Sequence, residues 1–189
     1  MGESTGRAGD KIGWNKLAGI VNFGLTKLRL RGIPVMVRKL QKADIDRVAD
    51  IWLDTNLKAH DFISAQYWKR NFELVKEMLL QAEVYVYESD QKIQGFIGLN
   101  NDYIEGIFVS DKMQSQGIGK ILLNDTKDKR NELRLNVYRK NTRAISFYQR
   151  EGFEIQSDGL DEATGEKEYA MVWKKNSCFS QNALISRSF

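Results

Sequence analysis

The sequence is poor in the residues that most often build metal centres and disulfide frameworks. Its 189 residues include one cysteine and one histidine, Cys178 and His60. A single cysteine excludes a disulfide within the chain, and the two residues together exclude a zinc site built from several Cys and His ligands. We therefore expect no metal and a reducing, cytoplasmic setting.

Long hydrophobic runs are also missing. No apolar stretch approaches the roughly 20 residues that a transmembrane helix needs, and the first residues lack the continuous apolar core of a signal peptide. The length and the 42% hydrophobic content suit one well-buried domain rather than two. We expect a soluble protein with one domain, two tails and no membrane partner.

Excess basic charge is confined to one end of the chain. Residues 1–35 contain six basic and two acidic residues, which accounts for the whole net charge of +4, and residues 36–189 are balanced. A balanced domain lacks the electrostatic footprint of a nucleic-acid binder, so we expect no nucleic-acid partner. Binding through the basic segment remains an alternative, and it predicts a steep salt dependence that disappears when residues 1–35 are deleted.

Composition divides the chain into three segments. Residues 36–175 are the predicted domain, since Met36-Val37-Arg38-Lys39-Leu40 begins it cleanly. Residues 1–35 are interpreted as a leader, or as an extension left by an expression tag or a misassigned start. The alternative is a basic amphipathic helix that touches a membrane or a partner, because apolar residues recur there at helical spacing: Trp14, Leu17, Val21, Leu25 and Leu28. For residues 176–189 we expect a disordered tail.

Hydrophobic periodicity predicts an α/β domain. Strands are expected at 35–40, 84–88, 93–99, 103–109, 133–138, 153–156 and 169–173, and helices from Asp44, at 64–80, at 117–131 and at 142–151. The order β-α-α-β-β-β-α-β-α-β-β indicates helices packed on one mixed sheet.

The most informative stretch is Gln114-Ser115-Gln116-Gly117-Ile118-Gly119, which joins the fourth expected strand to a helix. Glycines at a helix start let backbone N–H groups approach an anion, and the helix dipole adds roughly half a positive charge there. The dinucleotide motif GxGxxG fails for want of a glycine. The P-loop fails because Gln114 replaces its first glycine and Ile121 follows Lys120. The stretch therefore predicts a phosphate or pyrophosphate site of another kind.

What does fit is Q/R-x-x-G-x-G/A, the acetyl-CoA pyrophosphate loop of the GNAT family of N-acetyltransferases. Residues 141–153, NTRAISFYQREGF, resemble the family's N-x-x-A-x-x-F-Y-x-x-x-G-F helix and the strand after it. Upstream, an apolar patch around Trp52, His60 and Trp68 looks like that of the YiaC/YjaB-like subgroup. The resemblance covers about residues 36–175 and implies the GNAT fold, a mixed central sheet flanked by about four helices.

The resemblance implies an acetyl-CoA-dependent N-acetyltransferase that acts on a primary amine. Acetyl-CoA would be the co-substrate, without a metal, and the acceptor would be an amine-bearing small molecule or a protein, with a protein lysine among the candidates. The chain would be a monomer or a homodimer. An alternative of another class is a non-catalytic acyl-CoA-binding or sensor module.

The resemblance also assigns the cofactor contacts. Backbone groups of Ile107, Phe108 and Val109 would meet the pantetheine arm. Asn141 would lie near that arm, although capping the helix is a competing role. The remaining cofactor-binding candidates are Gln114, Gln116, Gly117, Ile118, Gly119, Lys120 and Phe147. For Lys120 a solvated surface position is the alternative.

Acetyl transfer to an amine needs a base, because a lysine amine has a pKa near 10.4, and the departing thiolate benefits from a nearby acid. Tyr148 matches the family's tyrosine acid; the alternative is a packed core aromatic. Peptide-acetylating members often carry a glutamate base where this chain has Asn136, whose amide cannot take up the proton. Glu105 is the best carboxylate available, acting through water, unless it is merely an exposed strand residue or a salt-bridge partner.

The acceptor side is expected to be lined by three aromatic rings. Trp52, His60 and Phe62 match the patch where the subgroup resemblance places the substrate. For the histidine, a structural or solvated role is the alternative, since a lone histidine is more often one of these than a catalytic group.

Overall fold

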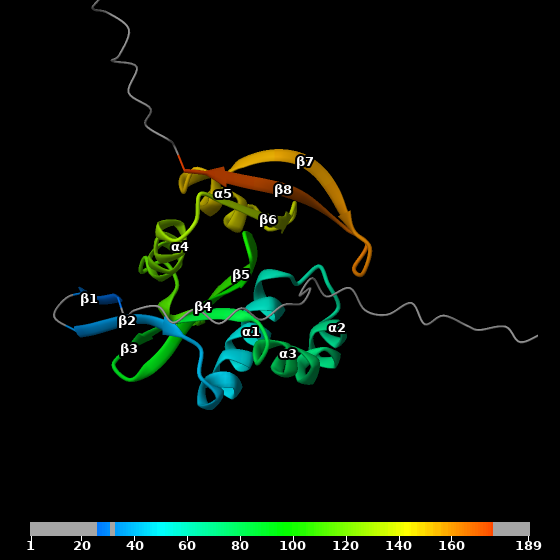
Figure 1. Cartoon of the computed structure of the whole chain (residues 1–189). Coiled ribbons are helices and arrows are strands. Elements are labelled where there is room, and N and C mark those ends of the chain that lie inside the picture. The colour runs from blue at the N-terminus through cyan, green and yellow to red at the C-terminus, as the bar shows by residue number, and fades with distance from the viewer. Residues whose placement is uncertain (1–25, 31–32, 176–189) are drawn as a thin grey trace, which may run out of the picture.

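A computed structural model describes residues 26–30 and 33–175 (Figure 1). One sheet of eight strands runs in the order β1-β2-β3-β4-β5-β6-β8-β7. All neighbouring strands are antiparallel except β5 and β6. The strands are β1 Thr26–Leu30, β2 Ile33–Lys39, β3 Glu83–Ser89, β4 Lys92–Asn100, β5 Tyr103–Val109, β6 Glu132–Tyr138, β7 Glu154–Asp161 and β8 Glu166–Lys174. The expected mixed sheet is confirmed.

Helices cover both faces of this sheet. They are α1 Ile45–Ala59, α2 Ala65–Arg70, α3 Phe72–Leu79, α4 Ile118–Asp128 and α5 Thr142–Arg150, with short 3-10 turns at Lys42–Asp44 and Asp111–Met113. The longest of them, α1, has 15 residues, and none in the described ranges is long and apolar enough to cross a bilayer.

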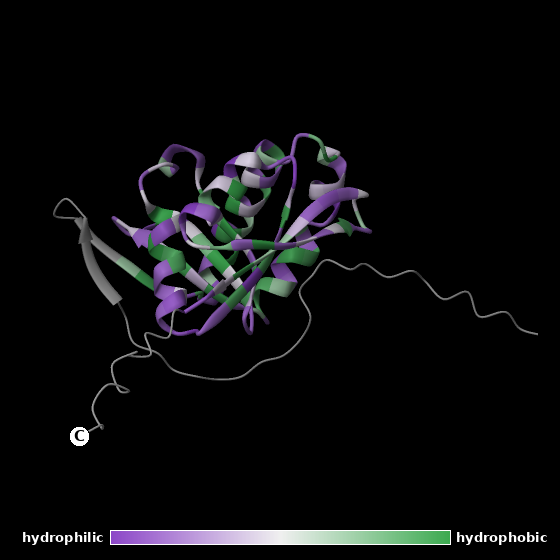
Figure 2. Ribbon diagram, turned by 90° about the horizontal axis from the view of Figure 1, so that it is seen from above, coloured by the Kyte–Doolittle hydropathy of each residue, from purple (hydrophilic) through white to green (hydrophobic). Residues whose placement is uncertain are grey.

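Successive side chains of the strands point to opposite faces of the sheet and so contribute to two separate hydrophobic cores. Val84 and Val86 of β3 pack with α1 and α3, whereas Tyr85 and Tyr87 belong to the core under α4 and α5. Figure 2 shows hydrophobic residues gathered where the helices meet the sheet and hydrophilic ones along the outer helix faces. On β6 only one side of the strand is buried, the side of Leu133, Leu135 and Val137. The other side of β6 remains open.

The helix expected over residues 64–80 is two helices, so the described part of the chain contains five α-helices where about four were predicted. The chain breaks at Asn71, whose side-chain amide donates to the Tyr67 carbonyl over 2.9 Å. A short amide side chain competes for backbone partners in this way and favours helix ends. Strands β7 and β8 also extend beyond the predicted spans, because β7 is exposed along almost its whole length and lacks a hydrophobic alternation.

Part of the segment 1–35 lies in the sheet. Strand β1 pairs with β2 from Thr26 opposite Val37 to Leu30 opposite Ile33. Most of the amphipathic pattern considered for Trp14 to Leu28, and the tail 176–189, lie outside the described residues. The boundary at residue 36 thus stays a prediction.

The sheet splits between β5 and β6. Their register contains one pair, Tyr103 with Arg134, and the Arg134 N–H donates to the Asp102 carbonyl at 2.8 Å. On the other edge of β5 the register with β4 jumps from Gly106 to Ile104, so Glu105 is an extra, bulged residue. A bulge bends its strand, and β5 turns away from β6 beyond Tyr103, as Figure 1 shows.

Candidate active site

The free edge of β5 faces the split. The Ser110 N–H donates to the Gln94 carbonyl on β4 at 2.8 Å, and backbone groups alternate in direction along a strand. Those of Phe108 therefore point to β4, and those of Ile107 and Val109 point toward the split. Of the three strand residues expected to meet the pantetheine arm, two direct backbone groups into the split, although the Val109 carbonyl already accepts from Gln114. The contact with the arm stays a prediction.

The predicted pyrophosphate loop lies at the end of this edge. Ser115 and Gly117 both have left-handed backbones, with φ of 61° and 84°, and Gly117 is the N-cap of α4. Left-handed residues beside right-handed ones turn successive N–H groups to one side, as in anion-binding nests. The Gln114 side chain secures the loop by donating to the Val109 carbonyl at 3.1 Å.

A residue that the sequence motif does not specify completes the loop. Arg143, in the first turn of α5, donates to Gln114 Oε1 at 2.9 Å and to Ser115 Oγ at 3.1 Å. It occupies an unspecified position of N-x-x-A, so the motif contains no signal for it. Both cations are exposed, but Lys120 forms an ion pair with Glu151 at 3.3 Å and not a bond to the loop. Arg143 is therefore the stronger candidate for a side-chain cation at the loop.

Helix α5 begins and packs as the resemblance implied. The Asn141 Oδ1 accepts the Ala144 N–H at 3.1 Å, so the expected cap is present. Phe147 reaches the start of α4, where a Cβ built on Gly119 would lie 3.5 Å from its ring. These contacts bring the two motifs of the sequence together in space.

Tyr148 is buried on the inner side of α5. Its ring is 5.2 Å from that of Phe147 and 5.4 Å from that of Phe153. Burial raises the pKa of Tyr148 well above that of an ordinary phenol, and the nearby Tyr103 adds to the shift. The phenol is accordingly protonated at neutral pH and available as a hydrogen-bond donor.

Glu105 sits at the bulge of β5. Burial raises its pKa to about 7, against a hydrogen bond from the Asn100 side chain that lowers it. Tyr103 has its own pKa raised to about 12, by burial first and then by the charge of Glu105. Tyr103 therefore interacts electrostatically with both candidate catalytic residues, Glu105 and Tyr148.

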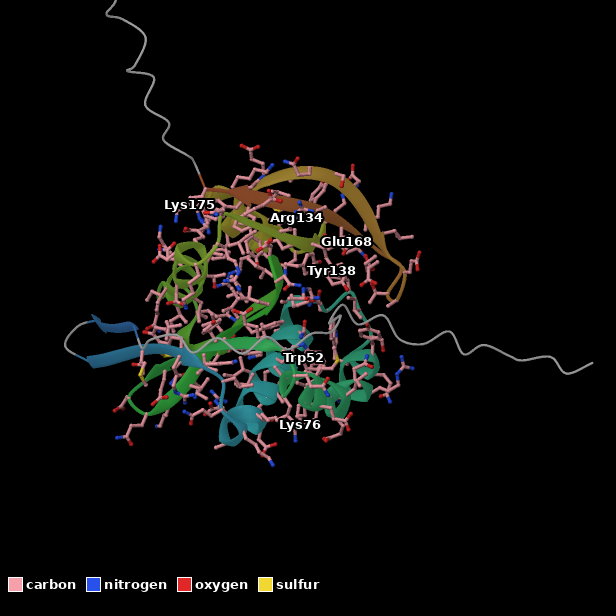
Figure 3. The ribbon with its side chains drawn as sticks, viewed as in Figure 1. Trp52, Lys76, Arg134, Tyr138, Glu168 and Lys175 are labelled. Carbon is pink, nitrogen blue, oxygen red and sulfur yellow. The ribbon has the colours of Figure 1, made fainter. Side chains whose placement is uncertain are left out.

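A cavity of about 500 Å³ opens on the uncovered side of β6 and β8. Its lining includes Tyr103, Arg134, Asn136, Gln156, Ala170 and Val172. Figure 3 labels Arg134, Tyr138 and Glu168 along this upper half of the sheet. Asn136, at the position where some family members carry a glutamate, donates through its side chain to Glu168.

The aromatic patch lies at one end of this open side, between the α1–α2 loop and β6. The His60 ring is 5.2 Å from Tyr138 and 5.7 Å from Phe62, and the Tyr138 hydroxyl donates to Asp161 near the β7–β8 turn. Trp52 is different: it is 5% exposed and packs edge-on against Trp68 at 5.7 Å. Trp52 is thus a core residue, and its expected contact with the acceptor stays a prediction.

His60 is bonded through both ring nitrogens. Nδ1 lies 2.9 Å from Asn56 Oδ1 and Nε2 lies 3.1 Å from Asn141 Nδ2. Burial lowers the pKa of His60 to about 4, although the nearby Asp61 raises it. His60 therefore contacts the cap of α5 as well as the aromatic patch. The sequence carries no signal for the Asn141 contact, since 81 positions separate it from His60. Asn56 lies only four positions before His60, a helical spacing that could have indicated this pair.

A mixed sheet split at its one parallel pair, with a glycine-capped helix at the end of the free edge, is the architecture of an acyl-CoA-dependent acyltransferase. The family model of the acetyltransferase (GNAT) domain matches residues 81–155. The peptidyl-lysine N-acetyltransferase YiaC of Escherichia coli K12 is 33% identical over 140 residues, which cover 73% of this chain and 96% of YiaC. The chain belongs to the GNAT family and is an acetyl-CoA-dependent N-acetyltransferase.

Further relatives agree with this assignment. The peptidyl-lysine N-acetyltransferase YjaB of Salmonella typhimurium LT2 is 30% identical over 122 residues, covering 64% of this chain and 84% of YjaB. The solution structure of apo YjaB from Escherichia coli superposes with a TM-score of 0.67 at 23% identity, over 73% of this chain and 96% of that one. The expected fold and the likeness to the YiaC/YjaB-like subgroup are confirmed.

Proposed function

We propose that the acceptor is the side-chain amine of a lysine in a protein or peptide, which enters from the open side of β6 and β8. The observation that carries the proposal is the split beside Tyr103, which joins that open side to the free edge of β5. Relatives named peptidyl-lysine N-acetyltransferases support this acceptor. The cavity of about 500 Å³ is open enough to admit an extended side chain.

The residues around the split suit acetyl-CoA. The free edge of β5 offers backbone donors and acceptors to the amides of a pantetheine arm, in the manner of an added strand. The Ser115–Gly117 turn and Arg143 would hold the pyrophosphate, with Asn141 and Phe147 along the arm. When bound, acetyl-CoA supplies the activated thioester.

Glu105 is proposed to take the proton from the acceptor amine, directly or through water. A base works best when its pKa lies near the operating pH, and burial brings that of Glu105 to about 7. Asn136 cannot take this role, and its amide is engaged with Glu168. The bulge that opens the sheet thus also carries the base.

Tyr148 is proposed to donate a hydrogen bond to the departing sulfur. Its raised pKa lies above that of a thiol, near 8.5, so complete proton transfer from the phenol would be unfavourable. A hydrogen bond to developing negative charge in a buried site still stabilises the transition state. This modifies the simple acid role that the family resemblance implies.

Thiol release tests the function. With acetyl-CoA we expect turnover on peptides with a free lysine side chain and a blocked N-terminus, and none on the same peptides after lysine acetylation. Spermidine serves as a small-amine comparison. Thiol release with spermidine alone would show that the acceptor is not a peptidyl lysine.

Tyr148→Phe separates the enzyme from a sensor module. The variant should keep its affinity for acetyl-CoA, because the aromatic packing is retained, and should lose about 100-fold in kcat. Binding would be followed by calorimetry and turnover by thiol release. If the unmodified protein binds acetyl-CoA but acetylates none of the amines tested, the sensor alternative is correct.

A further inference from the structure

A continuous chain of hydrogen bonds connects helix α1 to the start of helix α5 through His60. On α1, the Asn56 side-chain amide donates to the Trp52 carbonyl at 2.9 Å, and Asn56 Oδ1 faces His60 Nδ1 at 2.9 Å. On the other side, His60 Nε2 faces Asn141 Nδ2 at 3.1 Å. Asn141 in turn caps α5 through Ala144.

The polarity of this chain is determined at both ends. Asn141 must present Oδ1 to the Ala144 N–H, so its Nδ2–H group points at His60 Nε2, which has to accept. The Asn56 amide donates to the Trp52 carbonyl, so its oxygen accepts the Nδ1–H of His60. Only the neutral imidazole protonated at Nδ1 satisfies every bond. Protonation at Nε2 would set two donors against each other.

We propose that His60 is a positioning residue for the cofactor side of the site: it orients the Asn141 amide and ties the first turn of α5 to α1. This rests on the proposed contact of Asn141 with the pantetheine arm. The same turn carries Arg143, which joins the pyrophosphate loop. His60 thereby reaches the cofactor through Asn141, instead of serving the acceptor as its place in the aromatic patch first indicated.

The surroundings of His60 agree with a neutral ring. The charge of Asp61 favours the protonated form, but burial outweighs it and lowers the pKa of His60 to about 4. The other titratable group facing the ring is the Tyr138 phenol on β6. Lys140 lies 5.1 Å from the centre of the neighbouring Phe62 ring. A role as general base is disfavoured because the accepting Nε2 lone pair is already bonded to Asn141.

Nitrogen NMR of the untagged full chain tests the tautomer directly. His60 is the one histidine in the sequence, so its ring signals need no assignment. We expect the Nδ1–H tautomer, neutral from pH 5 to pH 8. In Asn141→Asp one carboxylate oxygen still caps α5 while the other faces Nε2, so the pKa of His60 should rise by at least one unit. An Nε2–H tautomer, or titration near 6.5 in the unmodified chain, would overturn the proposal.

A double-mutant cycle tests the link to the cofactor. His60→Phe keeps a ring in the aromatic patch and removes both hydrogen bonds, and Asn141→Ser keeps a helix cap and removes the donor to His60. Without acceptor present, we expect His60→Phe to weaken acetyl-CoA binding about fivefold, the equivalent of one hydrogen bond. In the Asn141→Ser background it should have no further effect. The KM for the acceptor should not change.

The outcomes distinguish this proposal from the proposed function. If His60→Phe raises only the acceptor KM and leaves acetyl-CoA affinity unchanged, His60 is an acceptor contact and the positioning role is wrong. If the unmodified chain does not bind acetyl-CoA, the cofactor site is wrong, although the NMR result still reports on the hydrogen-bond chain. Should His60→Phe fail to fold, the tautomer measurement decides the matter.

Discussion

At the scale of single residues, burial raises the pKa of both candidate catalytic groups, with a different consequence for each. Burial raises the pKa of Glu105 to about 7, where a carboxyl is ready to exchange a proton at neutral pH. Burial also raises the pKa of Tyr148, which moves a phenol further from ionisation. Low dielectric surroundings thus make the carboxyl a better base and keep the phenol a donor.

Glu105→Gln tests the base through its pH dependence. The carboxylate form is the active one, so kcat/KM of the unmodified enzyme should rise with pH through about 7. The variant should lose about 100-fold at pH 8 and show no such step. Initial rates of thiol release between pH 5.5 and 8.5 measure both. Glu168→Gln removes a carboxylate with a raised pKa from the same side of the sheet and should retain the step.

Glu105→Gln should also change how the free energy of unfolding depends on pH. Most carboxylates stabilise a fold less as pH falls, whereas Glu105 should stabilise it less as pH rises. Burial raises the folded pKa of Glu105 above the ordinary glutamate value of 4.5, so its contribution to stability is full below that value and is lost as pH rises through about 7. Glu105→Gln should therefore flatten this part of the stability profile in urea unfolding.

The kinetic prediction has its own contrary outcome. A step in kcat/KM near pH 7 that persists in Glu105→Gln would show that another group is the base.

At the scale of elements, the start of α4 depends on a glycine backbone. Gly117 has φ of 84°, and a Cβ built there meets no atom within 4 Å. Gly117→Ala should lower the free energy of unfolding by about 1 to 2 kcal/mol through backbone strain alone. It should also weaken acetyl-CoA binding, because the N–H groups of the loop shift. Urea unfolding and calorimetry measure the two effects.

A matched control for this prediction exists in the turn between β7 and β8. Gly165 has φ of 73° and equally open space around its Cβ. Gly165→Ala should cost similar stability and leave acetyl-CoA affinity unchanged. If both variants bind acetyl-CoA like the unmodified chain, the loop does not hold the pyrophosphate.

Elements could be predicted from the sequence where local patterns determine them. Strand β5, the glycine-capped start of α4 and the Asn141 cap of α5 follow from residues within a few positions of one another. The break at Asn71 was missed because the apolar spacing continues through it, and the interruption is a side-chain bond to Tyr67. The subgroup resemblance placed Trp52 at the acceptor mouth, and the sequence carries no signal for the ring of Trp68 that packs against it.

At the scale of the whole molecule, the site arises from contacts between distant parts of the chain. The split depends on a register jump at Glu105 and on a single β5–β6 pair, and neither has a signature in the strand sequences. Arg143 and the His60 to Asn141 bond likewise appear only when α5 is placed beside the loop and α1. The motifs therefore predict which residues surround the cofactor, whereas only the fold shows how those residues are arranged relative to one another.

The edge of the sheet offers a test of where the domain begins. Strand β1 pairs with β2 through five residues, and β2 pairs with β3 and contributes the buried Val37. A chain that starts at Ile33 lacks β1, so the edge of β2 is left without its partner strand. Compared with a chain that starts at Thr26, it should lose about 1 to 2 kcal/mol of unfolding free energy, since hydrogen bonds to water replace those to β1.

Two further measurements complete this comparison. An open edge favours pairing between molecules, so the chain starting at Ile33 should self-associate more strongly in sedimentation experiments. Acetyl-CoA affinity should be equal in both, because β3 and β4 separate β2 from the free edge of β5. Equal stability and equal association of the two chains would mean that β1 adds nothing to the domain, which would then begin with β2.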